Sequence, residues 1–241
     1  MFNKGFAKQL TDMKKIFILL LSVFVLNATH VCSQELAAYN DAKRIPHENH
    51  SLAFCHIAKA FETQIKNGDY SNLMKNLDKL SLPSDFMLRV EECKRKGLGG
   101  KSRLFVETLK GDNDYEIWDY IKAEDSVYGA WQVYLLYKAW HTLPLFWHAN
   151  YDRRTYLYST EDEGCTVGYA EETIPIPHHL IVEPDVVKGS DGRYYVSCCY
   201  WSDFGGLIQE ITEVRISRKN FVVVKDISEV TLYEYNCGIM F

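Results

Sequence analysis

Aromatic and acidic side chains crowd into one stretch of the sequence, between residues 114 and 147. Aromatic rings attract cations to their faces, and carboxylates pair with ammonium groups. This combination predicts a site for a small cationic amine if the rings line a cavity. In the alternative interpretation the rings fill a core and the carboxylates are solvated. The candidate ligand-binding residues are Trp118, Trp131, Tyr137, Glu116 and Asp119.

The sequence contains no pattern that is typical of catalysis or of cofactor binding. It has no Gly-x-Ser-x-Gly motif and no cysteine in a recognisable protease context, so we do not expect an enzyme. His178 and His179 precede Glu183 and Asp185, but adjacent residues of a strand point to opposite faces. Segment 97–102 (Gly-Leu-Gly-Gly-Lys-Ser) does not match the Gly-x-x-x-x-Gly-Lys-Ser/Thr pattern of a phosphate-binding loop, because Arg95 stands where the first glycine is required. We therefore expect no metal and no cofactor.

Composition and charge exclude other classes of protein. The chain has 241 residues, of which 47% are hydrophobic and 24% are charged, which rules out a disordered or low-complexity protein. The formal net charge is -5, and no basic stripe is present. We therefore expect no nucleic-acid partner.

Residues 1–33 are typical of a secretory signal peptide. Lys14 and Lys15 precede the apolar run Ile16–Leu26, and Val31-Cys32-Ser33 provides residues that signal peptidase accepts. We expect cleavage before Gln34 and a secreted, extracellular protein. The alternative is a membrane anchor, but a bilayer span needs about 20 apolar residues, so we expect no membrane association.

Six cysteines remain after this leader, and an even number in a secreted chain predicts three disulfides. We expect Cys55 and Cys93 to pair, because both lie on the apolar faces of predicted helices. Two adjacent cysteines of one strand point to opposite faces and need different partners. The six are Cys55, Cys93, Cys165, Cys198, Cys199 and Cys237.

One site of covalent modification is also predicted. Asn49-His50-Ser51 is an N-glycosylation sequon, which we expect to be accessible and used in a secreted chain. A second sequon, Asn27-Ala28-Thr29, lies inside the leader and is lost with it.

The elements that position these residues fall into two parts, a helical segment over 34–100 and an antiparallel β domain over 101–241. Phe54, Ala58 and Phe61 follow helical spacing, and Gly68 would end that helix. A second helix is expected to begin at Asp69 or Ser71 and to end before Pro83, with Leu73, Leu77 and Leu80 buried. A third is expected from Ser84 to residue 96, with Phe86, Val90 and Cys93 on one face.

After residue 101, short β-branched and aromatic runs alternate with turn residues. The fold class is therefore α+β, with the sheet closed into a barrel or folded into a sandwich. Tight turns are expected at Ser190-Asp191-Gly192 and at Arg218-Lys219-Asn220. The predicted strands are Arg103–Leu109, Trp131–Ala139, Thr155–Ser159, Thr166–Ala170, His179–Val187, Tyr194–Tyr200, Ile208–Ile216, Phe221–Lys225 and Thr231–Tyr235.

Several short motifs resemble those of tick salivary lipocalins, the family that includes histamine-binding proteins. The motifs are Thr155-Tyr156-Leu157-Tyr158-Ser159, Cys165-Thr166-Val167, the Cys198-Cys199 doublet with a terminal Cys237, Glu116-Ile117-Trp118 and Gly129-Ala130-Trp131. The resemblance implies a lipocalin-like barrel and the disulfides Cys165–Cys198 and Cys199–Cys237. The helical segment before the barrel departs from that family, so a related tick salivary immunosuppressant family is the alternative.

The resemblance also implies secretion in tick saliva and immunomodulation of a host. We expect a secreted, non-enzymatic salivary glycoprotein that binds and sequesters a biogenic amine or a lipid, or otherwise suppresses host defence. The alternative is a protein-interaction immunomodulator without a ligand cavity, whose partner is a host immune protein.

Overall fold

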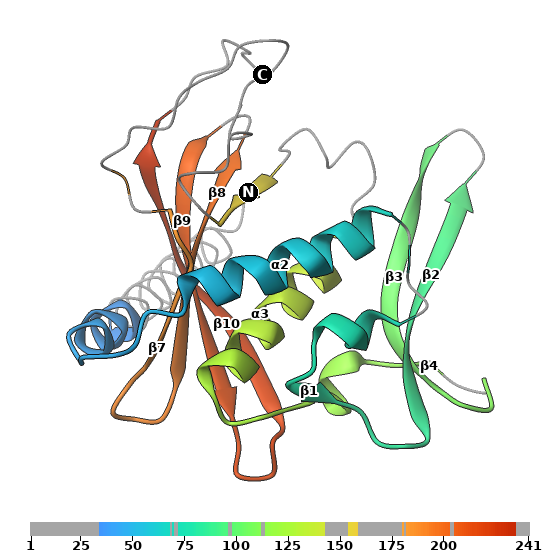
Figure 1. Cartoon of the computed structure of the whole chain (residues 1–241). Helices are drawn as coiled ribbons and strands as arrows, with labels where there is room; N and C mark the ends of the chain where they lie inside the picture. Colours follow the sequence, from blue (N-terminus) through green and yellow to red (C-terminus); the bar gives the residue numbers. More distant parts are fainter. Residues whose placement is uncertain are drawn as a thin grey trace, which may run out of the picture.

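The computed structural model has the predicted mixed α+β architecture (Figure 1). It describes residues 34–67, 69, 72–95, 98–111, 114–142, 154–158, 180, 182–202 and 205–234. Its helical elements are a helix over residues 34–43, α2 (Ser51–Lys66), η1 (Leu73–Asn76), η2 (Ile117–Asp119) and α3 (Val127–Thr142). Within these ranges, no helix is both long enough and apolar enough to cross a membrane.

A five-stranded antiparallel sheet forms the larger β layer. Its order is β10-β9-β8, and β6 and β7 both pair with β8, one along each half of its free side. The turn residues Gly192 and Asn220 have positive φ angles, and both predicted tight turns are confirmed by the antiparallel pairs that they connect. The strands are β6 (Arg154–Leu157), β7 (Asp185–Lys188), β8 (Tyr194–Ser202), β9 (Gly206–Ile216) and β10 (Val222–Tyr233).

Both faces of this sheet are covered, so every residue of β8 is buried. Tyr194, Val196 and Cys198 face a core that includes α2 and α3. Tyr195 faces the opposite way and packs against Tyr39 of the helix over 34–43. Alternating residues of a strand point to opposite faces, so β8 is apolar on both sides.

Two smaller sheets complete the described part of the chain. One has the order β2-β3-β4, and the other pairs β1 with β5. Figure 1 shows α2 and α3 between the five-stranded sheet and the β2–β3 pair. The strands are β1 (Leu80–Ser81), β2 (Phe86–Arg95), β3 (Leu98–Thr108), β4 (Asp114–Tyr115) and β5 (Lys122–Ala123).

The predicted strand Trp131–Ala139 is wrong, because this segment is the middle of α3. Residues 130–136 are all buried, since α3 is packed on several sides. A helix that is buried all round has no polar stripe, and its sequence therefore loses the helical period. At its start, a Cβ on Gly129 would lie only 2.0 Å from the carbonyl oxygen of Glu124, so the chain requires glycine there.

The predicted helix from Ser84 is also wrong, because Phe86–Arg95 is strand β2. Phe86 and Val90 are four residues apart, a spacing that both a helix and a strand place on one face. Leu88 between them is buried while Arg89 is exposed, which is the alternation of a strand. The described residues of the segment predicted as the second helix form only the short η1 and β1, although Leu73, Leu77 and Leu80 are buried as predicted.

The lipocalin-like barrel stays a prediction. The described strands lie in three separate sheets, and none of these closes on itself. The predicted strand Thr166–Ala170 lies outside the described residues.

Candidate functional site

The structure brings together two of the predicted ligand-binding residues and separates a third. The rings of Trp118 in η2 and Tyr137 in α3 lie 5.9 Å apart, and both are half-buried. Glu116 and Asp119 flank Trp118 and are exposed. Trp131 is fully buried elsewhere in α3, where its indole Nε1 donates a hydrogen bond of 3.1 Å to the carbonyl oxygen of Phe54. Trp131 is therefore a residue of the core.

Two further rings join Trp118 and Tyr137. Tyr137, Trp140 and His141 share one side of α3, because residues three and four apart in a helix lie above one another. The Trp118 and Trp140 rings are 5.9 Å apart, and the Tyr137 and His141 rings are 4.4 Å apart. Burial lowers the pKa of His141, so its imidazole is neutral at pH 7. We call these four residues the aromatic cluster.

A carboxylate from the sheet lies beside the aromatic cluster. Asp226 of β10 accepts hydrogen bonds from the Tyr137 hydroxyl at 3.0 Å, from Thr212 Oγ1 at 2.9 Å and from Lys138 Nζ at 3.2 Å. Thr212 is its direct cross-strand partner on β9. An irregularity in the pairing follows Asp226, and Ile227 packs on the opposite side of the sheet.

Lys138 bridges this carboxylate to a second one that is buried. Its Nζ lies 2.9 Å from Glu210 Oε2, and Glu210 also accepts a hydrogen bond from the Tyr134 hydroxyl. The same Nζ lies 5.4 Å from the centre of the Tyr134 ring and 5.2 Å from that of Tyr137. The protein therefore already holds one ammonium group between two carboxylates and two aromatic rings.

The two carboxylates respond differently to this environment. Burial raises the pKa of Glu210 and outweighs the opposing effects of Lys138 and Tyr134. For Asp226, burial also acts to raise the pKa, but the Lys138 charge and the hydrogen bonds from Thr212, Lys138 and Tyr137 outweigh it and lower the pKa. Asp226 is therefore ionised at neutral pH and, with its side chain 52% exposed, reaches solvent.

Cys198 and Cys199 are buried and do not form a nucleophilic site. Cys198 faces the core beneath α3, whereas Cys199 faces the opposite side of the sheet, as predicted. Burial raises the pKa of the Cys198 thiol well above its ordinary value, so the thiol is protonated at neutral pH. The predicted disulfides involve Cys165, Cys237 and the side chain of Cys93, which lie outside the described residues.

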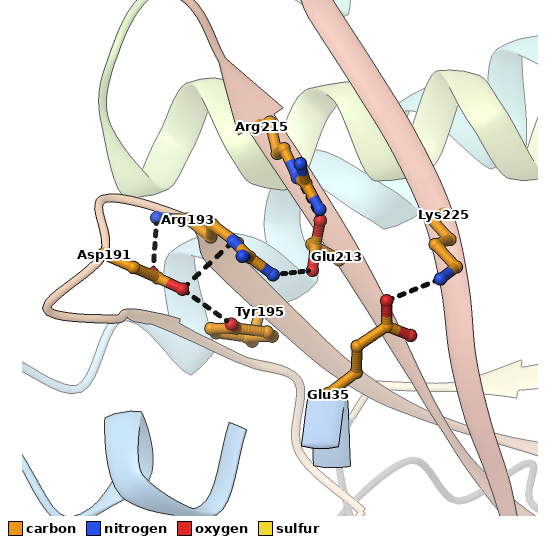
Figure 2. A network of polar contacts seen from close by, with 7 residues as sticks. All are labelled: Glu35, Asp191, Arg193, Tyr195, Glu213, Arg215 and Lys225. Carbon is orange, nitrogen blue, oxygen red and sulfur yellow. Dashed lines mark hydrogen bonds and ion pairs between the residues drawn. The ribbon is translucent and has the colours of Figure 1, made fainter. Parts of the chain in front are cut away.

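A second polar network lies on the other face of the sheet (Figure 2). The buried Glu213 of β9 accepts hydrogen bonds from Arg193 Nη1, at 3.0 Å, and from Arg215 Nε. Arg193 Nε also lies 3.0 Å from Asp191 in the β7–β8 turn, and Lys225 pairs with Glu35 of the first described helix. Each charged group in this network lies beside an opposite charge. We therefore interpret it as a structural network that holds the β7–β8 turn and the helix over residues 34–43 against the sheet.

In the part of the chain that the structure describes, no three side chains of His, Cys, Asp or Glu converge to hold a metal ion. No family model, no curated protein and no solved structure matches this chain. The geometry of the site therefore carries the functional argument.

Proposed function

We propose that this protein is a secreted, non-enzymatic binding protein that sequesters a small organic amine at the aromatic cluster and Asp226. One observation carries the proposal: the ionised, half-exposed Asp226 lies directly beside the half-buried ring of Tyr137, which contacts Trp118. Cation–π attraction and a charged hydrogen bond would both favour a ligand with an N–H cation.

Asp226 can accept a further hydrogen bond. A carboxylate has about four lone-pair positions, and three are used here, two on Oδ1 by Thr212 and Lys138 and one on Oδ2 by Tyr137. The one remaining lone-pair position is on Oδ2, the oxygen that accepts a hydrogen bond from Tyr137. A ligand ammonium at this position would lie beside the hydroxyl end of the Tyr137 ring.

Charge balance supports a cation rather than an anion. Glu116, Asp119 and Asp226 are carboxylates at or beside the cluster, and Glu210 lies beneath it, whereas Lys138 is the cation placed among them. Lys138 is shared by Asp226 and Glu210 and cannot neutralise both. The resemblance to tick salivary lipocalins also supports ligand sequestration, and the predicted leader supports secretion.

The class of ligand is tested by isothermal titration calorimetry of the secreted protein. We expect histamine or another biogenic amine to bind, and the matched alcohol, in which a hydroxyl replaces the ammonium, to bind at least tenfold more weakly. Trp118→Ala should weaken amine binding because it removes one ring of the cluster. Equal affinity for amine and alcohol would contradict the proposal, and binding of a fatty acid alone would favour a lipid ligand.

A second candidate function is protein interaction without a ligand cavity. Val223, Val230 and Tyr233 of β10 are large hydrophobic residues that are exposed to solvent. They are spread along β10, a strand at the edge of the five-stranded sheet, and an exposed edge strand can pair with another chain. If a host protein binds there, Val223→Ser should abolish its binding, whereas Trp118→Ala should not.

A further inference from the structure

The loop over residues 44–50 presents the sequon to solvent. It joins the first described helix to α2, and Asn49 is exposed. The loop is anchored on both sides of Asn49, because His47 Nε2 lies 3.3 Å from Asp185 Oδ1 and the His50 ring packs against Phe54 and Tyr128. Asn49 therefore stands on a supported part of the surface.

The side chains of the sequon are arranged so that its reactive groups are available. Asn49 Oδ1 accepts a hydrogen bond of 2.9 Å from the backbone N–H of Ser51, which forms an Asx turn. Among the described residues, neither the Asn49 amide nitrogen nor the Ser51 hydroxyl forms a hydrogen bond. The His50 side chain, at the start of α2, makes no capping hydrogen bond either.

Apolar side chains that face water flank Asn49. Leu52 is 71% exposed and Ile45 is 43% exposed, and Leu52 is the most exposed large hydrophobic residue in the described ranges. Leu52 points away from the core, into which α2 buries Phe54 and Ala58. A glycan is bulky and hydrophilic, and one attached to Asn49 would lie over this surface.

We propose that Asn49 carries an N-linked glycan that covers Ile45 and Leu52. In the reaction, the amide nitrogen of Asn49 forms a bond to C1 of a sugar, and the bond from that C1 to a polyprenyl diphosphate breaks. The diphosphate leaves with the bonding electron pair, and the nitrogen loses one proton to a base of the transferase. The inference rests on the secretory route of the proposed function, and it is independent of the amine site.

Translation of the full chain in the presence of microsomes tests the modification. We expect one glycosidase-sensitive gel shift, which Asn49→Gln and Ser51→Ala abolish and Ser51→Thr retains. Asn40→Gln, an exposed asparagine outside any sequon, and Asn27→Gln are the controls and should leave the shift unchanged. Protease protection shows whether the chain entered the lumen.

Each outcome decides the proposal. A protected chain without the shift would overturn the glycan and leave secretion intact. An unprotected chain without the shift would overturn both. A shift that survives Asn49→Gln would assign the glycan to another residue.

Covering of the apolar surface is tested separately on the secreted protein. Asn49→Gln should increase the fluorescence of an apolar dye, and adding Ile45→Ser and Leu52→Ser should return it to the level of the glycosylated protein. Equal dye fluorescence of the glycosylated and Asn49→Gln proteins would overturn the covering role.

Discussion

Lys138 connects helix α3 to two strands, because its ammonium lies between Glu210 of β9 and Asp226 of β10. Glu210 is almost fully buried, so its charge depends on this lysine. Removing one member of a buried ion pair commonly costs about 3–5 kcal/mol, since the other charge is left without compensation.

We therefore expect Lys138→Met to lower the free energy of unfolding by about 3 kcal/mol at neutral pH, measured by urea denaturation. Glu210 has a raised pKa when folded, so the folded state binds its proton more tightly than the unfolded state. The stability contributed by this group is complete below the unfolded pKa near 4.5 and is lost as pH rises through the folded pKa. The loss of stability caused by Lys138→Met should increase as pH rises over the same range, because more of Glu210 is then ionised without a partner.

The double variant Lys138→Met/Glu210→Gln is the matched control. It leaves no buried charge and keeps a side chain that can accept from Tyr134, so it should regain part of the lost stability. A double variant less stable than Lys138→Met would contradict this description of the pair.

Asp226 has the opposite pH dependence. Its pKa is lowered when folded, so its contribution is present above the unfolded value of 3.8 and is lost as pH falls through the folded pKa. Asp226→Asn should therefore cost up to about 1 kcal/mol at pH 7, a small value because this group is half-exposed. The difference from the wild type, measured by urea denaturation, should vanish in strong acid. A difference that stays constant from pH 7 to strong acid would show that the charge of Asp226 has no part in it.

Sequence patterns identified part of the candidate site at this scale. Trp118 and Tyr137 were selected because both belong to the aromatic-rich stretch, and the structure places their rings 5.9 Å apart, whereas their role as ligand-binding residues stays a prediction. Glu210 and Asp226 were missed because they reach α3 only through the register of β9 and β10, which lie far from it in the sequence. The available signal was a charge on a mostly apolar face of a strand, since Glu210 alternates with Ile208, Thr212, Val214 and Ile216 along β9.

At the scale of elements, whether the sequence predicted a helix or a strand correctly depended on how many sides of the segment are buried. Helix α2 buries one face, and its period was readable; α3 is surrounded, and its aromatic and β-branched residues resembled a strand. In β2, residues four apart fitted both types of element. Local patterns contain no information about the layer in which a segment is placed, so these ambiguities were not resolved.

The central position of α3 predicts a large cost for truncating its side chains. Leu136 is fully buried, so Leu136→Ala should lower the free energy of unfolding by about 2–5 kcal/mol in chemical denaturation. Leu52→Ala removes the same atoms from an exposed position of α2 and should change stability by less than about 0.5 kcal/mol. Similar costs for the two variants would contradict the placement of α3.

At the scale of the molecule, one hydrophobic core joins the five-stranded sheet to the three-stranded sheet β2-β3-β4. It contains Leu88 and Val106 of the β2–β3 pair, Trp131 of α3, and Val196 and Val214 of the five-stranded sheet. We therefore expect the β2–β3 pair and the five-stranded sheet to unfold together. Far-ultraviolet circular dichroism and tryptophan fluorescence should give one coincident thermal transition, whereas a separate early transition would mean that the β2–β3 pair is an independent unit.

The amine site is tested most directly by replacing its carboxylate and a matched one elsewhere. Asp226 and Asp125 are both aspartates that accept hydrogen bonds from a lysine and a tyrosine, and their side chains are 52% and 56% exposed. Asp125 pairs with Lys188 and Tyr194 and has no described contact with the aromatic cluster. In calorimetric titrations with histamine, Asp226→Asn should weaken binding at least tenfold, and Asp125→Asn should leave it unchanged. Equal binding by both variants, or no binding by the wild type, would contradict the proposed site.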